Sequence, residues 1–262
     1  YDATTSSATV PTITSGSLQG SDVAAFTQTY NNKNVGTGKT MTPSGVVTDG
    51  NSGNNYSYTF LNSTTGTITA RSLTITGADN SKTYDGNTTS STNPTITSGA
   101  LQGSDVAAFT QTYDNKNVGT GKTMTPSGVV TDGNSGNNYS YTFVTSTNGT
   151  ITSKTLTVSG ATTSNKVYDA TTTASVTGGT LVGVVSGDVV TLTQAGTFAN
   201  ANVGTAKAIT SSCSISGTDA GNYNLTQPTL TARDITTRAL TITAFSNSKT
   251  YDGNTTSSTN PT

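Results

Sequence analysis

The chain has 262 residues, of which 30% are hydrophobic and 10% charged, with a formal net charge of −1 and no His. A net charge near zero argues against nucleic acid as a partner, because phosphate binding needs clustered Lys and Arg, and no apolar run approaches the roughly 20 residues of a membrane span. The single cysteine, Cys213, excludes a disulfide within the chain and, with the lack of His, a Cys/His metal site.

An internal repeat dominates the sequence. Thr12–Phe60 and Thr95–Phe143 carry the same sequence except at Ser17/Ala100 and Asn31/Asp114. A Tyr-Asp pair recurs every 83 or 84 residues, at Tyr1, Tyr84, Tyr168 and Tyr251. A fixed period of this size indicates an array of small modules rather than one large fold. The low apolar content is also compatible with disorder, but β-branched and aromatic residues at fixed positions favour folded modules.

The opening strand of each module is the clearest predicted element. Apolar and polar residues alternate in it, which is the period of a half-buried strand. The three examples are Leu73–Thr76, Leu156–Ser159 and Leu240–Thr243. A basic residue stands two positions before each of them, at Arg71, Lys154 and Arg238.

Further elements follow inside each module. A strand or a single helical turn is predicted at 23–26, 106–109 and 189–193, where Ala pairs leave the choice open. The next strand begins at Lys39, Lys122 or Lys207 and directs Met41, Met124 or Ile209 inward. Gly- and Asn-rich stretches between the strands are typical of tight turns.

A last predicted strand carries aromatic residues on one face. In the first copy it is Tyr56–Phe60, with aromatic side chains at every second position, and Tyr139–Phe143 repeats it. The third copy keeps the pattern as Tyr223 and Leu225. We expect these side chains to face the core, and Cys213 to be a small buried residue. No segment shows helical spacing, so the fold class is predicted to be all-β.

The strand order predicts the module boundaries. Residues 1–70 form a repeat that lacks its first strand, 71–153 and 154–237 form complete repeats, and 238–262 form the first strand and turn of a further repeat. Each repeat is expected to be a small β-sandwich or β-grasp-like module of about 83 residues. Linkers of two or three residues predict an end-to-end, elongated rod. Without an initiator Met, the chain is expected to be a piece of a longer protein.

Several segments together resemble a known family. Lys82–Gly86, Asn202–Lys207, Asp219–Pro228 and Arg238–Ile242 are similar to the YDG repeat of large bacterial surface adhesins, found in haemagglutinin-like exoproteins beside related mostly β-grasp repeats. The resemblance implies a secreted protein, displayed on the bacterial surface, whose repeats are stalk or filament segments, and it supplies no catalytic residue. Ala3 and Ala170 replace the glycine of the motif, which predicts ordinary dihedrals there, because Ala is strained at positive φ.

Two Asp/Asn loops offer oxygen atoms in the alternating pattern of a calcium site. The candidate ligands are Asp49, Asn51 and Asn54 in the first copy and Asp132, Asn134 and Asn137 in the second. The third copy, around Asp219 and Asn222, keeps few of them. An Asx-rich turn is the favoured interpretation, and no cofactor or metal is predicted, with Ca²⁺ as the alternative.

Two further alternatives concern lysines and threonines. Lys39, Lys122 and Lys207 are in register and could form Lys–Asn or Lys–Asp isopeptide bonds if a neighbouring Asp shuttled the proton, although lysines at strand starts more often protect edges or cap turns. Thr-x-Thr triplets such as Thr74–Thr76 could form ice-binding ladders, but a strand composition explains them better, because the triplets lie in separate modules.

The composition and repeats predict a structural role rather than an enzyme. Without His or Glu, acid–base chemistry would rest on Asp or Tyr, and no nucleophile–base pair is evident. The first hypothesis is a stalk segment of a secreted bacterial adhesin that projects a distal binding region and supports cell adhesion or biofilm. The alternative is a repeat that binds glycans or other copies of itself, laterally or end to end by strand exchange, in an extracellular filament or matrix.

Overall fold

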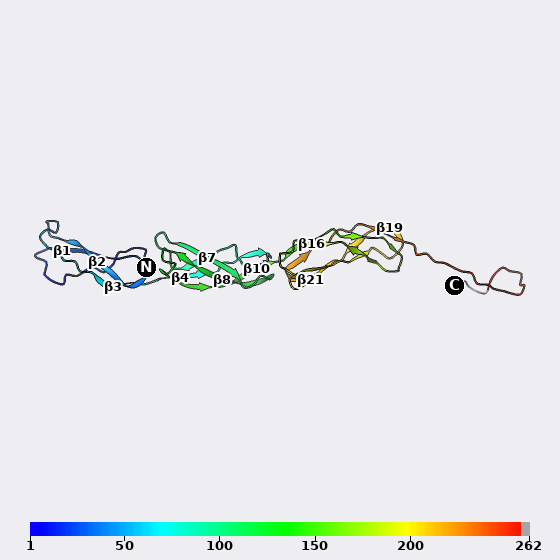
Figure 1. Ribbon diagram of the computed structural model, residues 1–262, viewed down its shortest axis with the longest axis horizontal. Coiled ribbons are helices and arrows are strands. Elements are labelled where there is room, and N and C mark those ends of the chain that lie inside the picture. Colours follow the sequence, from blue (N-terminus) through cyan, green and yellow to red (C-terminus); the bar gives the residue numbers. More distant parts are fainter. Residues whose placement is uncertain (258–262) are drawn as a thin grey trace. The chain divides into compact units, whose positions relative to one another are not determined.

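The computed structural model describes residues 1–257, which form β-strands joined by loops (Figure 1). Within these residues the one helical element is a single 3₁₀ turn, η1 (Ala220–Asn222), so the all-β prediction is confirmed. The chain divides into two compact units, unit 1 (1–152) and unit 2 (from Ser153 on). Residues 258–262 of the predicted further repeat lie outside the described residues. The described residues contain no helix long and apolar enough to span a membrane.

Unit 1 contains the first two repeats, here called repeat 1 (residues 1–70) and repeat 2 (71–153), except for the last residue of repeat 2. Its strands are β1 (Val23–Tyr30), β2 (Gly36–Thr48), β3 (Ser63–Ile68), β4 (Arg71–Thr76), β5 (Ser81–Thr83), β6 (Thr95–Ser98), β7 (Val106–Tyr113), β8 (Gly119–Thr131), β9 (Tyr139–Val144) and β10 (Ser146–Thr152). They form three sheets, ordered β1-β2-β3, β6-β4-β9 and β5-β10-β8-β7.

Repeat 2 is a small β-sandwich. Its core is a buried cluster contributed by both of its sheets, formed by Leu73, Ile75, Phe109, Val130 and Tyr139. Leu73, Ile75 and Tyr139 belong to the β6-β4-β9 sheet. Phe109 and Val130 belong to the four-stranded sheet. Because apolar residues alternate with Thr along these strands, one face of each sheet is buried and the other meets water. The predicted β-sandwich module is confirmed.

Strand β4 is the centre of the smaller sheet in repeat 2. It pairs with β9 in parallel along its whole length, from Arg71↔Tyr139 to Thr76↔Val144. On its other side it pairs antiparallel with β6, where Ile75 lies opposite Ile96. The predicted opening strand is therefore confirmed here, and its two apolar residues are almost fully buried.

Repeat 1 contains the same long hairpin as repeat 2, but it has no equivalent of the β6-β4-β9 sheet. β1 and β2 pair from Val23↔Thr48 to Tyr30↔Met41, as β7 and β8 do in repeat 2. The Ala pairs at 23–26 and 106–109 thus lie in strands and not in a helical turn. The strand predicted at Tyr56–Phe60 is wrong, because these residues form no strand and have no hydrogen-bonded partner strand within the described chain.

Unit 2 contains repeat 3 (154–237) and the segment that follows it. Its strands are shorter: β11 (Lys154–Ser159), β12 (Thr162–Thr163), β13 (Lys166–Val167), β14 (Thr173–Ala174), β15 (Val176–Thr177), β16 (Thr180–Val182), β17 (Thr191–Thr193), β18 (Gly196–Phe198), β19 (Gly204–Lys207), β20 (Ile209–Ser211), β21 (Ser214–Ser216), β22 (Tyr223–Leu225) and β23 (Arg233–Thr236). Its core cluster consists of Ala174, Val176, Phe198, Ile209, Leu230 and Ile235.

The opening strand of repeat 3 has the same surroundings as β4. β11 lies between β16 and β22 and pairs in parallel with β22, from Lys154↔Tyr223 to Leu156↔Leu225. The strand predicted at Leu240–Thr243 is wrong, because this segment is unpaired and Leu240 is 82% exposed. A strand needs a partner for its backbone N–H and C=O groups, and no described segment supplies one here.

Several predicted side-chain positions are confirmed. Met41, Met124 and Ile209 are buried at the predicted inward positions. Cys213 is buried too, with its Sγ near the Ala195 carbonyl oxygen. The prediction of ordinary dihedrals at the Ala-for-Gly positions is wrong. Ala3 and Ala170 have φ angles of 64° and 62°, close to the 82° of Gly86, so this turn uses the left-handed region and Ala adopts it under strain.

Candidate interaction sites

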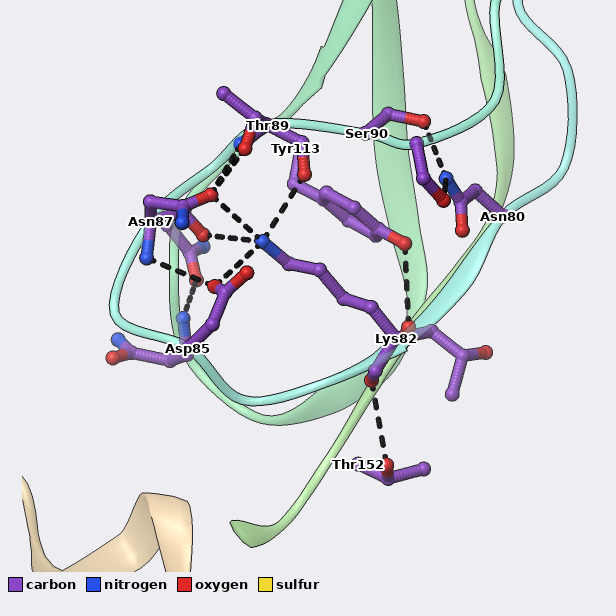
Figure 2. Close-up of polar contacts among 12 residues, drawn as sticks. Asn80, Lys82, Asp85, Asn87, Thr89, Ser90, Tyr113 and Thr152 are labelled. Carbon is purple, nitrogen blue, oxygen red and sulfur yellow. Dashed lines mark hydrogen bonds and ion pairs between the residues drawn. The ribbon is translucent and has the colours of Figure 1, made fainter. Parts of the chain in front are cut away.

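A lysine organises the loop that carries the Tyr-Asp-Gly motif in repeat 2 (Figure 2). The Lys82 Nζ donates hydrogen bonds to the Asp85 carboxylate at 2.8 Å and to the backbone oxygens of Asn87 at 2.8 Å and Thr89 at 3.1 Å. The same Nζ lies 5.3 Å from the centroid of the Tyr113 ring, an arrangement typical of a cation–π contact. One cation thus fixes the motif aspartate, two carbonyl groups and the hairpin beneath the loop.

The same lysine arrangement recurs in unit 2. Lys166 Nζ binds the Asp169 carboxylate at 2.7 Å and lies 5.6 Å from the Phe198 ring. Lys249 contacts Asp252 at 2.8 Å in the segment after repeat 3. The hydrogen bond from Lys166 lowers the pKa of Asp169 to about 2. The motif aspartate is therefore ionised at neutral pH and serves as an anchor for the loop.

A second set of lysines contacts asparagine side chains. The Nζ of Lys39, Lys122 and Lys207 each donates to the Oδ1 of the Asn seven residues earlier, namely Asn32, Asn115 and Asn200. Repeat 2 alone adds a carboxylate, because Asp114 lies 3.1 Å from Lys122 Nζ. These are the lysines named above as isopeptide candidates, and the covalent alternative stays a prediction.

The loops named as calcium candidates are held by backbone donors. The Asp132 Oδ1 accepts N–H groups from Asn134 at 2.7 Å and Gly136 at 2.8 Å, and its Oδ2 accepts the Asn138 N–H at 3.0 Å. Burial alone would raise the pKa of Asp132, but these three donors outweigh burial and lower the pKa. The Asn137 side-chain Nδ2 donates to the Asn134 carbonyl oxygen at 2.8 Å.

The first copy of this loop has the same contacts. Asp49 accepts N–H groups from Asn51 and Gly53 at 2.8 Å and from Asn55 at 3.1 Å, and Asn54 donates to the Asn51 carbonyl oxygen. This is the geometry of an Asx-type turn. Among the described residues, no group of three or more potential acidic or Cys ligands could hold a metal, and calcium binding by these loops stays a prediction.

A Tyr–Asp hydrogen bond recurs in all three repeats. The pairs are Tyr56–Asp22 at 2.7 Å, Tyr139–Asp105 at 2.7 Å and Tyr223–Asp188 at 2.5 Å. Burial, followed by the hydrogen bond to the Asp105 carboxylate, raises the pKa of Tyr139 to about 12. The hydroxyl also accepts the Gln102 N–H at 2.9 Å, so the pair ties the aromatic stretch to the loop before β7.

Within unit 1 this Tyr–Asp pair also contacts the preceding repeat. The Tyr1 hydroxyl donates to the same Asp105 oxygen at 3.0 Å, and the Tyr1 ring packs edge-on against Tyr139 with centroids 5.4 Å apart. Beside it, the Val35 N–H donates to the Asn138 Oδ1 at 2.9 Å. Asn138 is fully buried, so repeats 1 and 2 share a hydrogen-bonded junction with a buried side chain at its centre.

A groove of about 570 Å³ crosses repeat 1. It is lined by two stretches, 11–18 and 56–61, and by Phe26, Pro43 and Val47. The equivalent stretches of repeat 2 contain β6 and β9, and β4 is hydrogen-bonded between those two strands. The groove of repeat 1 therefore has the position and lining that β4 fills in repeat 2.

Comparison with known proteins places these repeats in one family. The family model of the YDG domain matches residues 69–148 and 152–231. The chain belongs to the YDG domain family. No curated protein and no solved structure matches it. Repeat 1 shares the sequence of the first matched YDG repeat over 12–60, with two substitutions.

The Tyr and Asp of the YDG motif make structural contacts in this chain. Its aspartate binds the loop lysine, and in repeat 1 its tyrosine binds the next repeat through Asp105. The reasoning from sequence overlooked the loop lysine. Its signal was present, because Lys82, Lys166 and Lys249 each stand three residues before the motif aspartate.

Proposed function

We propose that this chain is a non-catalytic structural segment of a secreted adhesin on the bacterial cell surface. In this proposal tandem YDG repeats extend a distal binding region away from the cell and support cell adhesion or biofilm. One observation carries the proposal: consecutive repeats of unit 1 share a junction in which Asn138 is fully buried and bonded to Val35. Repeats that contact each other through buried groups act as a mechanical series rather than as independent modules.

The junction is also short. Only Thr69 and Ala70 separate β3 from β4. A bend between the repeats would expose the Asn138 amide and the Tyr1–Asp105 hydrogen bond. Leaving a buried polar group such as the Asn138 amide without its partner costs roughly 1–3 kcal/mol, which supports a stiff connection between repeats.

A distance measurement between spin labels tests the stiffness. In a Cys213→Ala background, Ser21→Cys and Ser104→Cys place one label on an exposed loop of each repeat in unit 1. A stalk segment predicts a single narrow distance distribution by double electron–electron resonance. Adding Asn138→Ala should broaden the distribution, because the Val35 N–H loses its acceptor. A broad distribution in the parent chain would remove the basis of the proposal.

A further inference from the structure

The loop between β7 and β8 of repeat 2 brings an amine, an amide and a carboxylate together. The Lys122 Nζ lies 2.7 Å from the Asn115 Oδ1 and 3.1 Å from the Asp114 Oδ1. The other carboxylate oxygen, Asp114 Oδ2, accepts a hydrogen bond from the Asn115 Nδ2 at 3.3 Å. Asp114 therefore contacts both the amine of the lysine and the amide nitrogen of the asparagine.

The backbone holds these side chains in place. The Asp114 N–H donates to the Thr123 carbonyl oxygen at 3.0 Å, which places Asp114 beside the strand residue Lys122. The Asn117 N–H donates to the Asn115 Oδ1, also at 3.0 Å. This donor polarises the amide carbonyl and lies where negative charge would develop on the oxygen if a nucleophile attacked the carbon.

The lysine is close enough to the amide carbon to react with it. A carbonyl bond is about 1.2 Å long, so a nitrogen 2.7 Å from the Oδ1 lies at most roughly 4 Å from the Asn115 Cγ. Reacting atoms lie about 3–3.5 Å apart before a bond forms, a separation that a small rotation of the lysine side chain would reach. Lys122 is 7% exposed, so water has little access to its amine.

The carboxylate is in the form that can accept a proton. Burial alone would raise the pKa of Asp114, but hydrogen bonds from Lys122 and from the Asn115 N–H lower this pKa. Asp114 is therefore ionised at neutral pH and can take a proton from the lysine ammonium. Its second oxygen contacts the amide nitrogen, which would be the leaving group.

We propose that Lys122 and Asn115 form an intramolecular isopeptide bond in repeat 2, with Asp114 as the proton shuttle. Asp114 takes a proton from the Nζ ammonium, and the neutral amine forms the Nζ–Cγ bond. Asp114 gives this proton to Nδ2 and takes a second proton from Nζ. The Cγ–Nδ2 bond breaks, and the ammonia that leaves takes the second proton, which restores the carboxylate. The reaction needs no oxidant, reductant or cofactor, occurs once in each chain and does not depend on the adhesin role.

The other two repeats have the same lysine–asparagine pair without the shuttle. In repeats 1 and 3 the equivalent lysine also donates to the asparagine seven residues earlier. A backbone N–H two residues after this asparagine donates to the same Oδ1 at 3.1 Å in both repeats. The position of Asp114 is occupied by Asn31 in repeat 1 and by Ala199 in repeat 3. Neither side chain can take a proton from a lysine, so the bond is expected in repeat 2 alone.

Mass spectrometry of the purified chain tests the bond. The intact mass should be lower than the mass of the sequence by one ammonia molecule. After denaturation and digestion with trypsin, the chain should stay uncut at Lys122, and the peptide of residues 83–116 should be joined to that of residues 117–154. This branched peptide distinguishes the bond from a succinimide, which also releases ammonia but leaves the two peptides separate.

Substitutions at the shuttle position give matched controls. Asp114→Asn gives repeat 2 the residue of repeat 1, whose hairpin has the same strand pairing, so this variant should fold and keep its full mass. Asn31→Asp supplies the missing carboxylate in repeat 1 and should release a second ammonia molecule through Lys39 and Asn32. Lys122→Arg keeps a cation without the reactive amine and should keep its full mass.

Four outcomes would overturn the proposal. The first two are a full mass with separate peptides in the parent chain after prolonged incubation, and a branched peptide that persists in the Asp114→Asn variant. The third is a loss of ammonia that maps to a residue other than Asn115. The fourth is an Asn31→Asp chain that releases only one ammonia molecule, because a carboxylate would then not be the component that repeat 1 lacks. Each of them leaves the spin-label test of the junction unaffected.

Discussion

Repeats 1 and 2 carry one sequence in two structural contexts. In repeat 2 the aromatic stretch forms β9, Tyr139 is 4% exposed, and β4 pairs along the whole strand. In repeat 1 the same residues form no strand, and Tyr56 is half-buried. The two substitutions, Ser17/Ala100 and Asn31/Asp114, lie outside this stretch. The difference therefore comes from the neighbouring strand and not from the sequence of the stretch itself.

The comparison separates two contributions to the ordering of the aromatic stretch, namely side-chain contacts and backbone pairing. Side-chain contacts of Tyr58 and Tyr141 are the same in both repeats, so they depend on residues inside 12–60 or 95–143. Backbone pairing differs, because its partner β4 lies before the duplicated region. A Thr-rich strand has little apolar surface of its own, and its pairing depends on the strand beside it.

The largest expected effect follows from weakening β4 itself. Leu73→Ala removes a buried side chain from the repeat 2 core and should reduce the free energy of unfolding of this repeat by roughly 3 kcal/mol. Repeat 2 would then resemble repeat 1, with fast amide exchange in 139–143. Leu240→Ala is the matched control in a monomeric sample and should change stability by less than about 0.5 kcal/mol. Equal effects of both substitutions in chemical denaturation would contradict the role of β4.

Alkaline pH should weaken the Tyr–Asp pair of repeat 2. The folded-state pKa of Tyr139 is about 12, above the value of roughly 10 in an unfolded chain. Folding favours the neutral phenol, so the Tyr139 hydroxyl stabilises the folded state fully below about pH 10. This contribution to the free energy of unfolding is lost as pH rises to about 12, and its upper limit is roughly 2–3 kcal/mol. Stability measured against pH should fall in this window.

A variant without the two tyrosine hydroxyls tests whether these groups cause the loss of stability at alkaline pH. Tyr1 shares Asp105 with Tyr139, and its pKa is also raised to about 12, by burial and then by its hydrogen bond to Asp105. The Tyr1→Phe/Tyr139→Phe variant should therefore be less stable at neutral pH but lose less stability between pH 10 and 12. An unchanged pH profile in this variant would assign the dependence to other groups.

A smaller effect concerns the Ala-for-Gly positions of the motif. Ala170→Gly should stabilise unit 2 by roughly 1 kcal/mol, because φ is 62° at this residue and Gly adopts that angle without steric strain. Gly86→Ala should destabilise repeat 2 by a similar amount. Thermal or chemical unfolding of both variants checks the pair, and a destabilised Ala170→Gly chain would show that the strain argument is wrong.

The smallest effect on stability is expected at position 114, where repeat 2 has Asp and repeat 1 has Asn31. Asp114→Asn gives repeat 2 the residue of repeat 1 and removes the carboxylate 3.1 Å from Lys122. Asp114 is 42% exposed, so the loss, measured in chain that has not formed the Lys122–Asn115 bond, should be below about 1 kcal/mol and should shrink further at high salt. A loss of several kcal/mol would indicate that this ion pair does more than the half-exposed geometry implies.

Local alternation and composition predicted much of the fold. The all-β class, the opening strands β4 and β11, and the inward positions of Met41 and Met124 all follow from residues within a few positions of one another. The absence of a strand at Tyr56–Phe60 and at Leu240–Thr243 could not be predicted this way. Both segments have strand sequences, and only their missing partners decide the outcome.

The sites were less predictable than the strands. The left-handed dihedral of Ala170 contradicts the preference of its own residue type, and the turn around it is held by the Asp169 carboxylate, which accepts the Thr171 N–H. Asp2 accepts the Thr4 N–H in the same way around Ala3. The Tyr139–Asp105 pair joins residues 34 apart in sequence, a separation at which no local pattern connects them. The Lys82 cluster, in contrast, lies within seven residues of chain and was recognisable from its repeated spacing.

Amide hydrogen exchange in the two copies of the aromatic stretch tests the account most directly. The measurement uses the chain at low concentration, so that contacts between copies do not contribute. The account predicts slow exchange at Tyr141–Phe143 and fast exchange at Tyr58–Phe60, although the residues are identical. Equal protection of both stretches would contradict the claim that β4, and not the stretch itself, creates the strand.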